Sequence, residues 1–209
     1  NRIIFPIHNL SGKVIAFGAR IIKDEKNQPK YINSPETSLY IKSKVLYGLY
    51  QSKNNIRKED TCYLVEGYTD VISLFQIEIN NVVSSSGTSL TNDQIKLISR
   101  YTKNITILFD GDKAGIDASL RGMDLILEND MNVKIVSFPE GEDPDSYSKK
   151  VGKDEFIEFV KLNETNLINY KINLLNTKYK EDPVKKSEMI FDIVRSISKI
   201  PNSIKRSVF

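Results

Sequence analysis

The sequence predicts an α/β protein built around a mainly parallel sheet flanked by helices. Three observations support this class. Apolar strand patterns alternate with helical patterns over residues 61–150, a β-hairpin pattern precedes them, and a helical pattern follows them. Repeated strand–helix units of this length favour parallel strands with helices on the faces of the sheet. We therefore expect an amino-terminal α+β subdomain over residues 1–60, the sheet over 61–150 and a helical subdomain over 151–209.

The first predicted element is the β-hairpin. Residues 2–9 and 14–22 are mostly apolar, and the turn between them contains Ser11 and Gly12. Pro6 places the first strand at an edge or a bulge, because proline cannot donate a hydrogen bond to a neighbouring strand. Residues 24–48 are rich in Asn, Pro, Ser, Lys and Tyr without periodicity, so we expect an irregular surface connection there.

The middle of the chain carries the predicted sheet. We expect strands over residues 61–65, 82–84, 105–109 and 133–138. Helices are expected over residues 68–76, 91–101 and 114–128, and in the last part of the chain over 154–161, 164–179 and 184–198. Thr91 and Gln94 form the capping box that starts the second of these helices. Functional groups should gather at the carboxyl ends of the parallel strands.

Composition excludes several classes of protein. The chain has 209 residues, 40% of them hydrophobic, with 30 Lys and Arg against 27 Asp and Glu, and a single Cys. One cysteine cannot form a disulfide framework or a zinc ribbon, and no apolar run approaches the roughly 18 residues that span a bilayer. We therefore expect a soluble intracellular protein. Because the chain starts at Asn1 and continues at once into an apolar strand, we also expect a fragment of a longer protein whose two outer subdomains are partial.

Charge is unevenly distributed along the chain. Residues 1–60 carry 11 basic and 5 acidic side chains, whereas residues 61–150 carry 8 basic and 14 acidic ones. This division suits an enzyme that holds a polyanion with one part and divalent cations with the other. A solvated surface with chance clustering is the alternative.

The first acidic motif follows the first strand of the predicted sheet. Glu66 comes directly after that strand, Gly67 permits a tight turn, and Asp70 lies in the first turn of the next helix. A carboxylate near the amino end of a helix is favourable in itself, so Asp70 also has a purely structural explanation. Glu66 has no comparable structural role.

The second and third acidic motifs each contain a pair of aspartates. Asp110 and Asp112 flank a glycine after the third predicted strand. Asp143 and Asp145 flank Pro144 after the fourth. Taken alone, each pair could be a solvated turn. Together with Glu66 and Asp70 they would place six like charges at one edge of a sheet, and such charges repel unless divalent cations neutralise them.

These motifs resemble those of a known family. A glutamate after one strand and Asp-x-Asp after a later strand resembles the Toprim fold of primases, type IA and type II topoisomerases and certain nucleases. Further segments resemble, in register from Arg2 to about Ser148, the RNA polymerase domain of bacterial replicative primases of the DnaG type. These segments are Arg2–Ile7, Gly12–Arg20, Pro29–Thr37, Leu46–Leu49, Glu66–Asp70, Asp110–Gly115 and Gly141–Ser146. His8 departs from the family, which commonly has arginine at that position.

The resemblance implies an activity and a metal. It implies a nucleotidyltransferase, with DNA-directed RNA polymerase activity, that synthesises short RNA primers on single-stranded DNA from ribonucleoside triphosphates during replication. The implied catalytic residues are Glu66, Asp110 and Asp112, and the implied metal ligands are these three with Asp70, Asp143 and Asp145. Mg²⁺ is the expected ion, with Mn²⁺ as a substitute. Whether Glu66 binds the ion or acts as a general base is open.

The resemblance also implies binding partners. The implied nucleotide- and DNA-binding residues are Arg2, Arg20, Lys30, Tyr31, Asn33, Lys42 and Gly87, although a plain turn is the alternative for Gly87. The zinc-binding module and the helicase-binding module of the family are absent from these residues. We therefore expect no zinc here, and contact with the replicative helicase only through the absent module. A bacterial cytoplasmic location at replication forks, without a membrane, is implied.

Two other functions are alternatives to primer synthesis. A Toprim nuclease or a topoisomerase would use the same carboxylates to cleave DNA, but the amino-terminal motifs argue against both. A non-catalytic nucleic-acid clamp would keep the basic segment and lose the metal site, and the intact acidic motifs argue against it.

Overall fold

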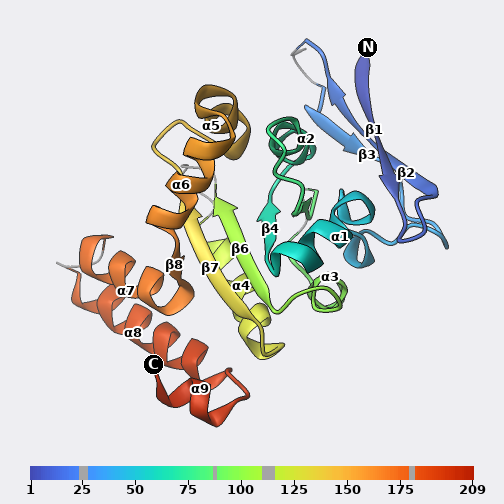
Figure 1. The fold of residues 1–209 in the computed structure, drawn as a ribbon. Helices are drawn as coiled ribbons and strands as arrows, with labels where there is room; N and C mark the ends of the chain where they lie inside the picture. The colour runs from blue at the N-terminus through green and yellow to red at the C-terminus, as the bar shows by residue number, and fades with distance from the viewer. Residues whose placement is uncertain (24–27, 87–88, 110–115, 179–181) are drawn as a thin grey trace.

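A computed structural model describes residues 1–23, 28–86, 89–109, 116–178 and 182–209, of which Phe109, residues 116–121 and Lys178 are described by their backbone alone. The small antiparallel sheet and the carboxyl-terminal helices lie at opposite ends of a larger central sheet (Figure 1). Within the described residues, no helix is long and apolar enough to cross a membrane.

The amino-terminal hairpin is confirmed. Strands β1 (Arg2–His8) and β2 (Val14–Ile21) pair antiparallel, and β2 also pairs with β3 (Tyr31–Asn33). Pro6 lies on β1, an edge strand whose register shifts between Ile7 and His8, as the missing N–H group predicts.

The connection expected to be irregular contains regular structure. Besides β3 it holds a short 3-10 helix, η1 (Lys42–Lys44), and the chain then enters α1 (Leu49–Glu59), which we did not predict. No side chain caps α1, because its N-cap residue is Gly48 in a left-handed conformation. The usual polar signal for a helix start was therefore missing. Leu49 and Ile56 pack α1 into the core nonetheless.

The central sheet has the strand order β5-β4-β6-β7-β8. The parallel members β4 (Cys62–Val65), β5 (Val82–Ser84), β6 (Asn104–Phe109) and β7 (Asn132–Ser137) match the predicted strands. The helices between them also match, namely α2 (Tyr68–Gln76), α3 (Asn92–Ile98) and α4 (Ile116–Glu128). Thr91 caps α3 as predicted, accepting the backbone N–H of Gln94 while the Gln94 side chain accepts that of Thr91.

The last part of the chain holds two elements that we did not predict. The subdomain expected to be helical contains a short strand, β8 (Thr165–Asn166), which pairs antiparallel with β7. The third acidic motif contains the start of a helix, α5 (Pro144–Val151). Proline suits the first position of a helix, where its missing N–H group is not needed, and Asp143 caps that helix.

Helices cover both faces of the central sheet. The larger core cluster lies under α1, α3, α4 and the carboxyl-terminal helices, and the smaller one lies under α2, α5 and α6 (Lys153–Asn163). The remaining helices are α7 (Leu167–Lys178), α8 (Pro183–Ser198) and α9 (Ser203–Ser207). Leu167 and Ile193 belong to the larger cluster, so α7 and α8 share the core of the sheet.

A buried ionic cluster fixes α7 and α8 to α4. Lys171 on α7 is fully buried, and its ammonium donates to Asp192 at 2.6 Å and to Ser196 at 2.6 Å on α8. Asp124 on α4 lies 3.3 Å from the same ammonium and 3.4 Å from that of Lys199. The lysine and aspartate charges neutralise one another in the protein interior, where an unpaired charge is costly.

An aromatic cluster joins the small sheet to the central one. The Tyr68 ring, at the start of α2, stacks on Phe5 at 5.0 Å and meets Tyr47 edge to face at 4.7 Å. A Cβ atom on Gly18 would lie 2.6 Å from that ring, so only glycine allows β2 to approach α2 this closely. This joint sets where the small sheet lies relative to the acidic strand ends.

Candidate functional site

The strands that precede the three acidic motifs end at one edge of the central sheet. The parallel register pairs Leu64 of β4 with Ile107 of β6, and Phe109 of β6 with Ser137 of β7. The carboxyl ends of these three strands therefore lie together, and one acidic motif follows each of them in the sequence. Asp110 and Asp112 lie outside the described residues, as does Gly87.

The first motif forms the start of α2. Asp70 is buried, and its Oδ2 accepts the backbone N–H of Gly67 at 2.8 Å, so its side chain folds back onto the start of the helix. Asp70 therefore does have the structural role that its place in the first turn of a helix suggested. Glu66 is exposed at the strand end, and the pKa of its carboxyl is raised by partial burial and by the nearby Asp70. Both causes disfavour the charged form of Glu66, and burial is the larger of the two.

The carboxylates of the third motif also have partners within the protein, and one of these partners is a cation. Asp143 Oδ1 accepts the backbone N–H of Ser146 at 2.6 Å. Asp145 Oδ1 accepts the hydroxyl of Ser73 on α2 and lies 2.6 Å from the ammonium of Lys149. Partial burial of Asp145 acts against ionisation, but the hydrogen bonds from Lys149 and Ser73, with nearby positive charge, outweigh it. The pKa of Asp145 therefore lies below its ordinary value.

Helix α2 brings the first and third motifs together. Asp70 and Ser73 are three residues apart, so they lie on the same face of α2, and Ser73 contacts Asp145. The candidate metal ligands that the structure describes at this edge are all carboxylate oxygens, which suit a hard divalent cation. Among the described residues, however, no three such side chains form a group that could hold a metal ion. A complete site would need the second motif.

The basic side chains of the small sheet fall into two groups. Arg20 lies 5.6 Å from the centre of the Tyr31 ring, its partner on β3, and its charge helps to lower the pKa of Asp145. This strand face therefore borders the acidic edge. Asn33, on the same face of β3 as Tyr31, accepts the hydroxyl of Tyr68 at 2.7 Å. Arg2 instead donates to the backbone oxygen of Pro29 at 3.0 Å and supports the connection before β3.

The two remaining predicted cations are Lys30 and Lys42, which have no counter-ion among the residues that the structure describes. Lys30 is exposed just before β3, and Lys42 is half-buried at the start of η1. Neither makes an ion pair with any residue that the structure describes. The carbonyl of Lys42 accepts a hydrogen bond from the side-chain amide of Gln94 at 3.2 Å, which holds the backbone of η1. The ammonium of Lys42 forms no ion pair with a described residue.

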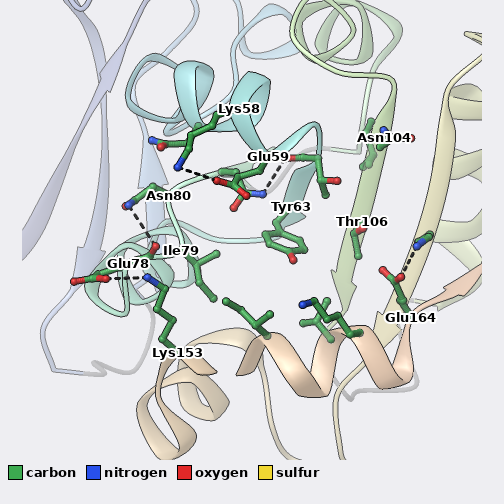
Figure 2. A pocket seen from close by; sticks show the side chains of 18 of the residues that line it. Lys58, Glu59, Tyr63, Glu78, Ile79, Asn80, Asn104, Thr106, Lys153 and Glu164 are labelled. Atoms are coloured by element: carbon green, nitrogen blue, oxygen red, sulfur yellow. Dashed lines mark hydrogen bonds and ion pairs between the residues drawn. The ribbon is translucent and has the colours of Figure 1, made fainter. Parts of the chain in front are cut away.

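A groove that the sequence did not predict lies at the opposite end of the sheet. It has a volume of about 1000 Å³, and Tyr63 and Thr106 line it from β4 and β6 (Figure 2). Ion pairs also line it: Lys58–Glu59, Lys153–Glu78 and Lys134–Glu164. Asn104 and Asn132, which begin β6 and β7, lie there too, so the groove is at the amino ends of the strands. Its residues come from distant parts of the chain, and no local motif marks it.

Comparison with known proteins adds independent findings. Residues 1–53 match the family model of the DNA primase catalytic core, N-terminal domain, and residues 63–148 match the Toprim-like family model. The chain is 46% identical over 201 residues to a DNA primase of Clostridium acetobutylicum, covering 96% of this chain and 32% of that protein. It thus spans about a third of the length of the curated relatives it matches.

Solved structures are similar along nearly the whole chain. A DNA primase domain from Pseudomonas aeruginosa superposes with a TM-score of 0.87 at 36% identity, covering 99% of this chain and 65% of that one. A DnaG primase catalytic domain bound to single-stranded DNA superposes with a TM-score of 0.85 at 34% identity, covering 99% and 67%. The α/β fold and the resemblance inferred from the motifs are both confirmed.

Proposed function

Because the chain belongs to the DnaG-type DNA primases, as part of their catalytic core, we propose that it joins ribonucleotides into short RNA primers on single-stranded DNA. One observation carries the proposal. The Arg20–Tyr31 face of the small sheet lies beside the start of α2, the helix that carries Asp70. The centres of the Tyr31 and Tyr68 rings are 6.4 Å apart, and Arg20 lies 5.6 Å from the centre of the Tyr31 ring. A cationic and aromatic surface beside carboxylates suits a reaction that brings a triphosphate to a metal ion.

The metal site in this proposal is formed by all three acidic motifs. Glu66, Asp110 and Asp112 would hold one Mg²⁺ ion, and Asp70, Asp143 and Asp145 would hold or orient a second. Toprim domains generally depend on metal, and Asp70 beside Glu66 adds a second negative charge that a bound cation would neutralise. When bound, the ion would neutralise phosphate charge and make the attacking 3′-hydroxyl more acidic. Glu66 would act either as a ligand or as the base for that hydroxyl.

The small sheet would hold the substrates. Arg20 would contact the triphosphate or the template backbone, and Lys30 and Lys42 would contact the template, because their ammonium groups have no counter-ion among the described residues. Tyr31 presents a ring on which a base can stack. A similar catalytic domain has been solved with single-stranded DNA, which supports this class of ligand. Contact with a replicative helicase stays a prediction.

Primer synthesis can be tested directly on this chain. The chain would be incubated with single-stranded DNA, ribonucleoside triphosphates and Mg²⁺, and labelled RNA products would be separated by length. We expect short RNA products that disappear when the metal is chelated. A parallel reaction with labelled DNA detects cleavage. DNA cleavage without RNA synthesis would replace the proposal with a Toprim nuclease, and DNA binding without either product would replace it with a clamp.

Template binding should depend on Lys30 and Lys42. We expect Lys30→Ala and Lys42→Ala each to weaken binding of a fluorescent single-stranded oligonucleotide. Each should also reduce the slope of log affinity against log salt by about 0.7, the value for one lost phosphate contact. Fluorescence anisotropy across a salt series measures both quantities.

The matched control for these variants is Lys103→Ala. Lys103 is also exposed, but it lies before β6 at the other end of the strands, so its loss should leave the slope unchanged. If Lys30→Ala and Lys42→Ala behave like the control, the basic segment is an ordinary solvated surface.

A further inference from the structure

Asp145, in the third acidic motif, already has a lysine bound to it. The ammonium of Lys149, one helical turn later on α5, lies 2.6 Å from Asp145 Oδ1. The hydroxyl of Ser73 donates to the same oxygen from α2. The Lys149 side chain is 60% exposed, whereas that of Asp145 is 21% exposed. The carboxylate is therefore held in place, and the lysine that neutralises it is free to move into solvent.

A lysine in this position competes with a metal ion. An ammonium group and a divalent cation repel each other when both lie against one carboxylate, because the two like charges are only a few ångströms apart. Ser73 carries no charge and can continue to orient Asp145. The lysine, by contrast, has to leave before the carboxylate can serve an ion fully.

We propose that Lys149 is a built-in counter-ion of Asp145 that a second metal ion displaces when it binds. This inference rests on the proposed function, because it assumes that Asp145 serves that ion. It explains how the third acidic motif is kept stable without metal. It also makes the second ion bind more weakly than the carboxylates alone would allow, so the site fills when metal and substrate are both present.

The neighbouring residue provides a matched control. Lys150 has the same charge, is 66% exposed, and pairs with Glu142 at 3.0 Å. Lys149→Met and Lys150→Met therefore remove the same charge at adjacent positions of one helix. Lys149→Met removes the counter-ion of Asp145, whereas Lys150→Met leaves that counter-ion in place.

The test is a Mn²⁺ titration of the chain, followed by electron paramagnetic resonance of the free ion at constant ionic strength. Wild type, Lys149→Met, Lys150→Met and Asp145→Asn would be compared. We expect Lys149→Met to bind the weaker Mn²⁺ ion about three- to tenfold more tightly, as expected from removing an exposed ion pair and its charge. Lys150→Met should change the affinity less than twofold, and Asp145→Asn should lose the weaker ion.

The outcomes separate this inference from the proposed function. Mn²⁺ binding that Lys149→Met does not change, or changes no more than Lys150→Met does, would overturn the counter-ion role and leave the metal site intact. If none of the four proteins binds Mn²⁺, both the counter-ion role and the proposed metal site are wrong. If Lys149→Met binds one Mn²⁺ ion more than wild type does, the result would support the inference strongly.

Discussion

Replacing Glu66 with glutamine is expected to reduce primer synthesis at least about 100-fold, because several kcal/mol of metal-dependent stabilisation of the transition state would be lost. The change removes one negative oxygen at nearly constant volume from an exposed strand end. The fold should therefore survive. Product formation per enzyme, measured with saturating nucleotides, gives the size of the loss.

The same variant should be slightly more stable than wild type at neutral pH. Burial and Asp70 raise the pKa of Glu66 in the folded protein, so ionised Glu66 disfavours folding. Because the pKa of Glu66 is raised in the folded protein, the cost of its charge to folding develops as pH rises through that raised pKa. The difference between the variant and wild type should accordingly shrink below the ordinary pKa of glutamate. Thermal unfolding at several pH values without metal measures it.

Glu140→Gln is the control for Glu66→Gln. Glu140 is an exposed glutamate that also follows a strand end, but it belongs to none of the proposed ligand sets. Its loss should leave primer synthesis within about twofold of wild type. Comparable activity in the two variants would remove Glu66 from the catalytic set.

Replacing Lys171 with methionine is expected to lower the free energy of unfolding by about 3 kcal/mol. Breaking a buried ion pair costs about 3–5 kcal/mol, because the remaining charge is left in a place from which water is excluded. The lower end applies here, since Asp124 keeps Lys199 at 3.4 Å and Asp192 is partly exposed. Urea unfolding, followed by circular dichroism, measures the loss.

Two comparisons make the Lys171 experiment decisive. Lys134→Met breaks an ion pair with Glu164 whose lysine is exposed, and it should cost less than about 1 kcal/mol. The double variant Lys171→Met with Asp124→Leu removes both buried charges and should recover much of the lost stability. If Lys171→Met costs no more than Lys134→Met, the buried cluster does not fix α7 and α8 to the sheet.

Much of the fold could be predicted because its signals are local. The turn after His8, the Thr91–Gln94 capping box and the short apolar strands each mark their own element. Helix α1 was missed because Gly48 gives no side-chain cap, and β8 was missed because a two-residue strand exists only through its pairing with β7. Such elements depend on packing, which no local pattern reveals.

The candidate site was predictable in its residue types but not in its pairings. The spacing of acidic residues after strands placed Glu66 and Asp145 at one edge, and α2 joins their motifs there. That Lys149 and Ser73 hold Asp145 could not be predicted, because Ser73 is 72 residues away and α5 was not among the predicted helices. The structural role of Arg2 was likewise hidden, since its partners lie across the connection before β3.

Anomalous diffraction from crystals of the chain grown or soaked with millimolar Mn²⁺ tests the central claim most directly, namely that the acidic strand ends bind the catalytic metal. We expect at least one manganese peak at the carboxyl ends of β4 and β6, in contact with Glu66 and with Asp110 or Asp112. Manganese bound only elsewhere, or no peak at that edge in well-diffracting crystals, would contradict it.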